Sequence, residues 1–142
     1  MALFQKRGQD TSLPKADRGF GSFDDYAFDL IPRNGRVTIT LADSDPHQDE
    51  LRAIVDTGQL SAETAISARS IEQDRVDAPI PVRLFTGSRV SGVVGSVPRG
   101  LESVIDEALR RLEDRGDKPR IPARIVGKPG AWRVQLLMGA TR

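Results

Sequence analysis

The sequence predicts an α+β fold: a small, curled, barrel-like antiparallel β-sheet with one short and one long α-helix, preceded by an extended N-terminal arm. Several short segments alternate apolar and polar residues between turn signals, as half-buried strands do. Only residues 101–115 show a long apolar period typical of a helix. Residues 1–30 sustain no apolar period and predict the arm, so we expect the folded domain to occupy residues 31–142.

The composition excludes several kinds of chemistry. The 142 residues include no cysteine, which excludes disulfides, thiolate catalysis and cysteine-bound zinc. His47, the single histidine, lacks a partner pattern for catalysis, and the acidic residues at 43–50 lack the spacing of a calcium loop. We therefore expect no enzyme activity, no catalytic residue, no metal and no cofactor. We also expect no membrane span and no secretory signal, and a location in the cytoplasm or in an assembled phage particle.

The arm is unusual because its residues 20–28 alone hold four of the seven aromatic residues of the chain. Exposed aromatic side chains are unfavourable in water, so we expect them to dock on an apolar surface. That surface belongs either to the core of this chain or to a protein partner, and the sequence favours neither decisively. The four residues are Phe20, Phe23, Tyr26 and Phe28.

The first elements of the domain are a strand and a short helix. Residues 35–42 alternate in polarity and predict a half-buried strand, entered through a turn at Asn34. Asp45 and Pro46 predict a helix start, at which Gln48 is placed to complete a capping box. Gly58 predicts the end of this helix.

The middle of the chain is less regular. Residues 62–72 permit either a helix or a strand. Residues 82–85 and 89–95 flank a turn at Gly87 and predict a β-hairpin. The prolines that precede this hairpin indicate an edge position.

The last third of the chain predicts a helix and two strands. Acid-before-base pairs, Asp106–Arg110 and Glu107–Arg111, are expected on the outer face of the helix. Gly116 predicts its end. Two further strands, joined by a glycine-rich turn, are predicted at 121–126 and 131–138.

Charge is distributed unevenly along the chain. Residues 31–80 contain five Arg or Lys and nine Asp or Glu, a net charge of −4, whereas residues 81–142 contain twelve and six, a net charge of +6. A chain polarised in this way attracts anions to its basic half. We expect this half to bind DNA, single-stranded or duplex. The phosphate contacts are predicted from Arg99, Arg120, Arg124, Lys128 and Arg133.

Two features of the basic half each have two interpretations. Trp132 lies among the cations and is placed to stack on a base, but it also shares a face with Val134 and Leu136, which indicates a core residue. The glycine-rich stretch 90–101 lacks the spacing of a dinucleotide fingerprint or a P-loop. It is either a corner that presents free N–H groups to an anion or a plain turn between strand and helix.

Three motifs and the order of the pieces over residues 35–138 resemble the HIRAN domain family. Residues 45–51 resemble the short helix that a Tyr-Gln pair opens in the family, and residues 73–82 match the place of its Asn-Pro-x-Asp strand. Residues 94–99 are similar to its Val-Gly-Tyr-Leu-Pro-Arg corner. The resemblance implies a barrel-like fold with a helix, and its strand order favours a strand over residues 62–72.

The resemblance also implies a function, because DNA-binding members of the family grip a single-strand 3′ end at these positions. This chain carries His47 where the family has an aromatic residue and Ser96 where an aromatic residue or His is usual, and its Asn-Pro-x-Asp box has no asparagine. We interpret the chain as a non-enzymatic binding module for DNA or a DNA-processing complex. The alternative is a structural or assembly protein, such as a minor phage particle component, whose residues 1–30 bind a neighbouring subunit.

Overall fold

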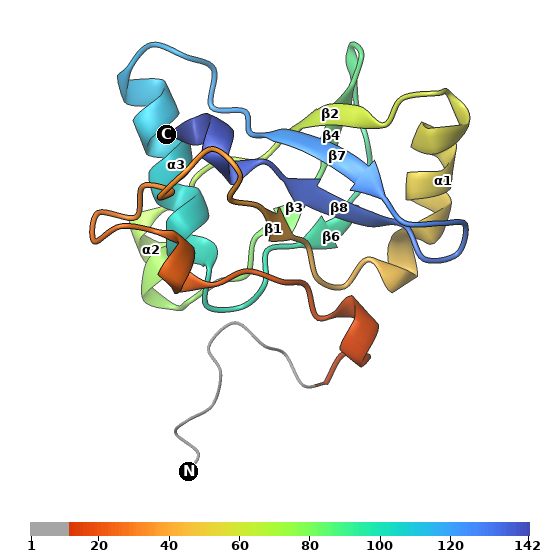
Figure 1. The fold of residues 1–142 in the computed structure, drawn as a ribbon, viewed down its shortest axis with the longest axis horizontal. Helices are drawn as coiled ribbons and strands as arrows, with labels where there is room; N and C mark the ends of the chain where they lie inside the picture. The colour runs from red at the N-terminus through yellow and green to blue at the C-terminus, as the bar shows by residue number, and fades with distance from the viewer. Residues whose placement is uncertain (1–11) are drawn as a thin grey trace.

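The computed structural model describes residues 12–142, and the part of the arm before Ser12 lies outside these residues. Helices and antiparallel strands occur together, which confirms the α+β fold (Figure 1). The helices are α1 (Gln48–Asp56), α2 (Ile71–Arg75) and α3 (Glu102–Asp114). The strands are β1 (Ile39–Thr40), β2 (Ser61–Thr64), β3 (Pro81–Val82), β4 (Leu84–Thr86), β5 (Arg89–Val90), β6 (Gly95–Ser96), β7 (Pro122–Val126) and β8 (Arg133–Leu136). Within residues 12–142, no helix is long and apolar enough to cross a membrane.

The sheets curl into a ring. Six antiparallel strands pair in the order β1-β8-β7-β2-β4-β5, and β3 pairs separately with β6. A bridge between Ala42 and Ser96 joins the chain just after β1 to β6. Because β3 and β4 follow each other with only Arg83 between them, the pairings run from β1 around to β4 and return through β3 and β6. The predicted barrel-like sheet is therefore present.

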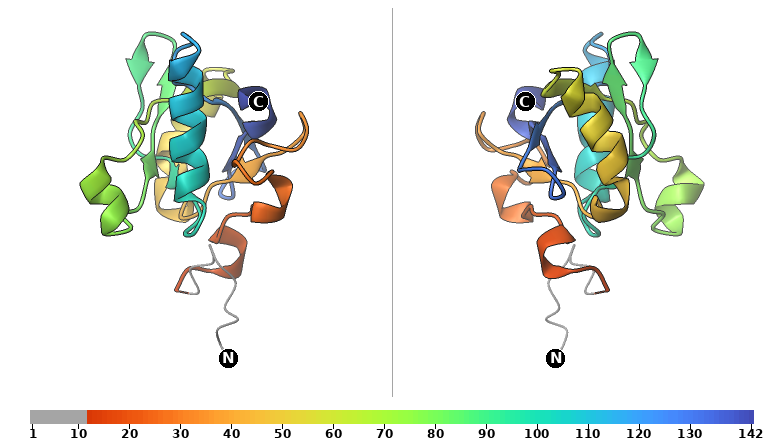
Figure 2. Two further views of the ribbon diagram at one scale, coloured as in Figure 1. Left: turned by 90° about the vertical axis from the view of Figure 1, so that its left-hand side faces the viewer. Right: turned by 90° about the vertical axis from the view of Figure 1, so that its right-hand side faces the viewer.

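The core fills this ring, and the helices close its two ends. Figures 1 and 2 show α1 and α3 on opposite sides of the strands. Burial of apolar side chains is the main stabilising contribution to such a fold. The predicted apolar face of α3 is buried as expected, in the residues Leu101, Val104, Ile105, Ala108, Leu109 and Leu112.

The start of α1 is built differently from the prediction. Gln48 does not complete a capping box, because its Nε2 donates to the carbonyl oxygens of Ser44 and Trp132, and its Oε1 accepts from the Trp132 N–H at 2.7 Å. Asp45 and Pro46 instead begin a 3-10 turn, Asp45–His47, that leads into α1, and its first N–H groups bind a distant side chain. The buried carboxylate of Asp17 accepts from the N–H groups of Ser44, at 2.7 Å, and Asp45, at 2.9 Å.

The ambiguous segment 62–72 contains the end of one strand and the start of a helix. Its first residues belong to β2, as predicted, but α2 begins at Ile71. Ser70 and Gln73 form a capping box at the start of α2. The predicted strand is wrong at its C-terminal end because a local capping signal, rather than apolar alternation, decides the backbone there.

The predicted ion pairs on α3 are also wrong. Asp106 is buried and pairs with Arg69, and Arg110 pairs instead with Glu107 at 2.9 Å. The Nε of Arg111 donates to the Thr141 carbonyl oxygen at 2.9 Å. The i,i+4 spacing placed these charges on one helix but could not reveal partners from other elements.

The four aromatic side chains of residues 20–28 in the predicted arm divide into two groups. Tyr26 is buried in the core, and Phe23 packs against the core. Phe20 and Phe28 are 76% and 103% exposed. Phe20 nevertheless has a fixed backbone, because its N–H and C=O exchange hydrogen bonds with Thr40. Docking on the core of this chain is therefore confirmed for Tyr26 and Phe23. The side chains of Phe20 and Phe28 face outward.

Tyr26 is the only tyrosine of the chain, and its hydroxyl is buried with no partner among the described residues. Burial first, and then the charge of Asp25, raises the pKa of the Tyr26 phenol well above its ordinary value of 10.0, against a smaller opposing effect of Arg111. The folded protein thus retains this proton more tightly than the unfolded chain, and stability decreases as the pH rises above the ordinary tyrosine pKa.

We expect the ultraviolet absorbance of tyrosinate to stay absent at the ordinary tyrosine pKa and to appear only as the protein unfolds at higher pH. Circular dichroism on the same samples reports unfolding. Tyr26→Phe is expected to be less sensitive to alkaline pH. Reversible ionisation near the ordinary tyrosine pKa in folded protein would contradict the burial of Tyr26.

Candidate nucleic-acid interface

The outer side of the six-stranded sheet is open to solvent. Cross-strand partners in an antiparallel sheet carry their side chains on the same face. Ile39, Leu136 and Ala123 form one such row and point into the core. The rows beside it point outward and define what we call the open sheet face. One outward row is Phe20, Thr40, Gln135, Arg124 and Ser61, and the other is Leu137, Pro122, Glu63, Phe85 and Val90.

Arg124 is the central cation of the open sheet face. It is exposed on β7, and its Nε donates to the amide oxygen of Gln135 at 2.8 Å. No carboxylate of residues 12–142 lies within ion-pair distance of its guanidinium. A neutral partner fixes the direction of the side chain without cancelling its charge, so Arg124 is free to bind an anion.

Arg120 lies beside the same face, above an aromatic ring. The central carbon of its guanidinium is 3.9 Å from the centroid of the Phe85 ring, which is a cation–π contact. Its NH1 is 3.5 Å from a carboxylate oxygen of Glu63, a long and half-exposed ion pair. Solvent screening weakens such a pair, so Arg120 keeps much of its capacity to attract an anion.

Arg133 is also near this face, but its guanidinium is engaged. It forms an ion pair with Asp45 at 2.9 Å, and its side chain is 16% exposed. Its remaining nitrogens donate to the carbonyl oxygens of Ala16 and Trp132. Arg133 thus connects β8 to the N-terminal segment through Ala16, and to the turn before α1 through Asp45.

The turn before β8 contains the last two predicted residues of this region. Lys128 is exposed in the turn, and Trp132 is half-buried and packs against the core. The Trp132 backbone N–H is held by Gln48. This packing supports the core interpretation of Trp132 rather than the stacking interpretation.

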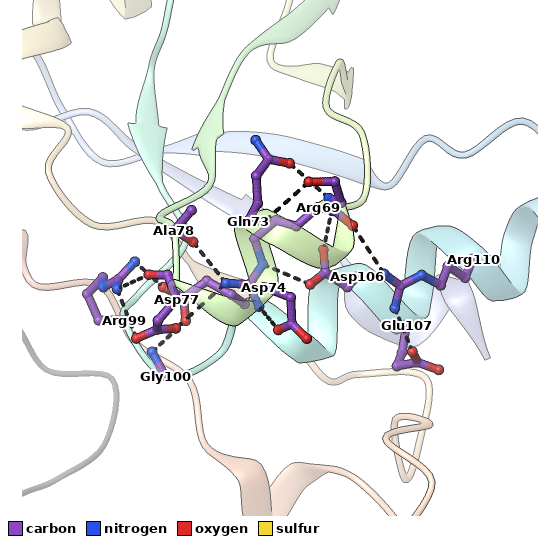
Figure 3. A network of polar contacts seen from close by, with 12 residues as sticks. Arg69, Gln73, Asp74, Asp77, Ala78, Arg99, Gly100, Asp106, Glu107 and Arg110 are labelled. Atoms are coloured by element: carbon purple, nitrogen blue, oxygen red, sulfur yellow. Dashed lines mark hydrogen bonds and ion pairs between the residues drawn. The ribbon is translucent and has the colours of Figure 1, made fainter.

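Arg99 belongs to a different polar cluster, at the start of α3 (Figure 3). Its NH2 is 3.0 Å from Asp77, and its NH1 is 2.8 Å from Glu102. Glu102 is buried, so one of these carboxylates holds the cation with little screening. The structure therefore does not bring Arg99 together with Arg120 and Arg124 on the open sheet face.

Figure 3 shows that this cluster continues to Arg69. Asp106 binds Arg69 twice, accepting from its backbone N–H at 2.8 Å and from its Nε at 2.9 Å. Ala78 accepts a further hydrogen bond, and Asp74 forms an ion pair at 3.1 Å. Burial lowers the pKa of the Arg69 guanidinium, but the hydrogen bond and charge of Asp106 outweigh it and raise this pKa.

The glycine-rich stretch 90–101 is a plain corner. The N–H of Gly100 is taken by the carboxylate of Glu102 at 2.7 Å, and those of Ser96 and Val97 by carbonyl oxygens. An anion would have to displace these partners, so the phosphate-binding interpretation has no support. Gly95 is needed for close packing, because a Cβ there would lie 2.8 Å from the Ser44 hydroxyl oxygen.

Three buried carboxylates that organise the region were missed by sequence reasoning. Asp17 lies in the segment interpreted as an arm, and no sequence signal marks it. Asp106 was assigned to the solvent face of its helix. Glu102 had a signal, because acidic residues are favoured in the first turn of a helix, where N–H groups are unpaired.

Comparisons with family models, curated proteins and solved structures found no match for this chain. Within residues 12–142, no group of three or more His, Asp or Glu residues is arranged to hold a metal ion. The function must therefore be inferred from the surfaces themselves.

Two neighbouring carboxylates of α3 give a test of the buried cluster. Asp106→Ala is expected to destabilise the protein by about 3–5 kcal/mol, because Arg69 then lacks its buried partner. Glu107→Ala is the matched control: its ion pair with Arg110 has the same 2.9 Å distance but is half-exposed, and its loss should cost about 0–1 kcal/mol. Urea unfolding measures both values, and equal costs would contradict a stabilising role for burial of Asp106.

Proposed function

We propose that this chain is a non-enzymatic binding module that holds single-stranded DNA across its open sheet face. One observation carries the proposal: the exposed ring of Phe20 and the uncompensated cation of Arg124 lie in the same cross-strand row. They are three strand spacings apart, a distance of about 14 Å.

The two groups have complementary chemistry for a single strand. An exposed aromatic ring stacks on an unpaired base, and a guanidinium contacts the phosphate backbone. Arg120, held over Phe85, adds a second cation at the other side of Arg124. A duplex offers only its phosphates to such a surface because its bases are already stacked, so the proposal favours a single strand.

Two segments on which the resemblance to the HIRAN family rests lie next to each other. Residues 94–99 and 73–82 meet where β6 pairs with β3, and Arg99 pairs with Asp77. This neighbourhood supports the family relationship as a proposal. The open sheet face, however, lies on other strands, so the DNA-binding proposal does not depend on that relationship.

We expect fluorescence anisotropy to show that labelled oligothymidylate binds more tightly than a duplex of equal length. The logarithm of the affinity should fall with the logarithm of salt concentration by about 0.7 per phosphate contact. Arg124→Gln should lower this slope by about one contact. Phe20→Ser should weaken binding by about 1–3 kcal/mol and leave the slope unchanged.

Arg52→Gln is the control, because Arg52 is an exposed arginine on α1, away from the open sheet face. It should leave both the affinity and the slope unchanged. If the wild type does not bind at low salt, or if Arg52→Gln and Arg124→Gln weaken binding equally, the open sheet face is not the interface.

A second function is favoured by Phe28. Its side chain is fully exposed, yet the loop that carries it is tightly closed by hydrogen bonds between Ala27 and Ile31 and between Leu30 and Ala27. An apolar side chain on a fixed loop is preorganised for a protein partner. We infer as an alternative that the chain is a structural or assembly protein, such as a minor phage particle component, in which residues 20–28 contact a neighbouring subunit.

Under this alternative, sedimentation velocity should show that the wild type self-associates as its concentration rises. Phe28→Ser should remain monomeric without losing stability, since the ring contributes nothing to the core. Val76→Ser, which removes another exposed apolar side chain, should associate like the wild type. A wild type that is monomeric at every concentration would argue against assembly with its own copies through Phe28.

A further inference from the structure

Among residues 12–142, the strand β5 is a free edge of the six-stranded sheet. Its partner β4 pairs Phe85 with Val90, and the N–H of Ser91 donates to the carbonyl of Leu84 at 2.8 Å. Hydrogen-bonded and non-hydrogen-bonded pairs alternate along antiparallel strands. The Leu84 N–H donates to the Ser91 hydroxyl at 3.0 Å. Because the Ser91 N–H points to β4, the N–H and C=O of the preceding Val90 point away from β4, toward the free edge. A free edge of this kind is a template for another strand.

A groove runs along this edge, with α1 as its opposite wall. The hairpin of β4 and β5 lies near α1 in Figure 2, and the space between them is a cavity of about 500 Å³. The helix contributes four residues with i, i+3, i+4 and i+7 spacing, which place them on one face. They are Glu50, Ala53, Ile54 and Thr57, and they face Arg89, Val90, Ser91 and Gly92.

Glu50 is a half-buried carboxylate with no cationic partner. It lies against Gly92, where an added Cβ would be 3.1 Å from its Oε2. No cation of residues 12–142 lies within ion-pair distance of it, whereas the buried carboxylates of Asp17, Glu102 and Asp106 are all bonded. A partly desolvated carboxylate gains most from a cationic partner, so this wall of the groove attracts a positive charge.

We propose that the groove binds an extended peptide by β-strand addition to β5, with a Lys or Arg of the peptide placed at Glu50. The backbone groups of Val90 can pair with a further strand, and the Glu50 carboxylate can pair with a cation. An extended peptide with a basic side chain supplies both. Because α1 stands opposite the edge, a single strand fits the groove better than the edge of another folded sheet. The groove shares only Val90 with the open sheet face, and this proposal does not rest on DNA binding.

The probe is a fluorescein-labelled peptide of alternating Thr and Val with a central Lys, compared with the same peptide carrying a central Glu. By fluorescence anisotropy we expect the Lys peptide to bind, and the Glu peptide to bind about tenfold more weakly. N-methylation of alternate residues of the Lys peptide removes its backbone donors and should abolish binding. Hydrogen exchange at the Val90 amide should slow when the Lys peptide binds.

Two substitutions on α1 distinguish a specific role of Glu50 in the groove from a general effect of the negative charge of the helix. Glu50→Gln should weaken binding of the Lys peptide about tenfold. Asp49→Asn, an exposed neighbour outside the groove, should leave binding within about twofold, as rim charges usually do. Absence of wild-type binding, equal binding of the N-methylated peptide, or equal effects of the two substitutions would each overturn the proposal.

Discussion

The ion pair between Arg69 and Asp106 holds the chain between β2 and β3 against α3, and closure of the barrel depends on it. The helical part of that chain has little apolar surface to bury, since Ile71 and Val76 are both exposed. Burying two charges costs several kcal/mol per ion unless hydrogen bonds replace the lost water. Here the Arg69 guanidinium bonds to Asp106, Asp74 and the carbonyl of Ala78, so the cost is offset. The strand β3, which returns the sheet to β6, follows directly from this anchored segment.

A buried carboxylate also holds the N-terminal segment in place. Asp17 is buried, accepts from the two N–H groups that begin the turn Asp45–His47 before α1, and lies 3.9 Å from Arg133 on β8. An irregular segment with few buried apolar residues gains its position from a carboxylate that satisfies otherwise unpaired donors. Charged anchors thus fix the two irregular parts of the chain, while apolar burial fixes the regular elements. The open sheet face depends on this arrangement, because the anchored Asp17 lies three residues before Phe20 and so fixes the chain that places Phe20 beside β1.

Elements with local periodicity could be predicted from the sequence, and long-range pairings could not. The apolar period of α3 and the turns before β5 and β8 depend only on neighbours in the chain, so they were found. The contacts of Asp17 and Asp106 join residues 27 and 37 positions apart, which no local pattern encodes. The candidate site shows the same division. On charge alone, Arg124 and Arg99 are equal candidates for phosphate contacts. In the fold, Arg124 has only a neutral partner, Gln135, among residues 12–142, whereas Arg99 is paired with two carboxylates.

Closure of the ring also explains why the sheet offers two different kinds of surface. At β1 the edge is covered, because Phe20 bridges to Thr40 and Ala42 bridges to Ser96. At the other end, the segment that contains β3 and β4 turns inward to meet β6, and β5 is left outside the ring, paired with β4 on one side only among residues 12–142. The outer face therefore presents side chains, and in the proposed DNA binding their charges and rings select the ligand. The β5 edge presents backbone groups, and in the proposed strand addition these select an extended peptide, whose side chain Glu50 then selects by charge.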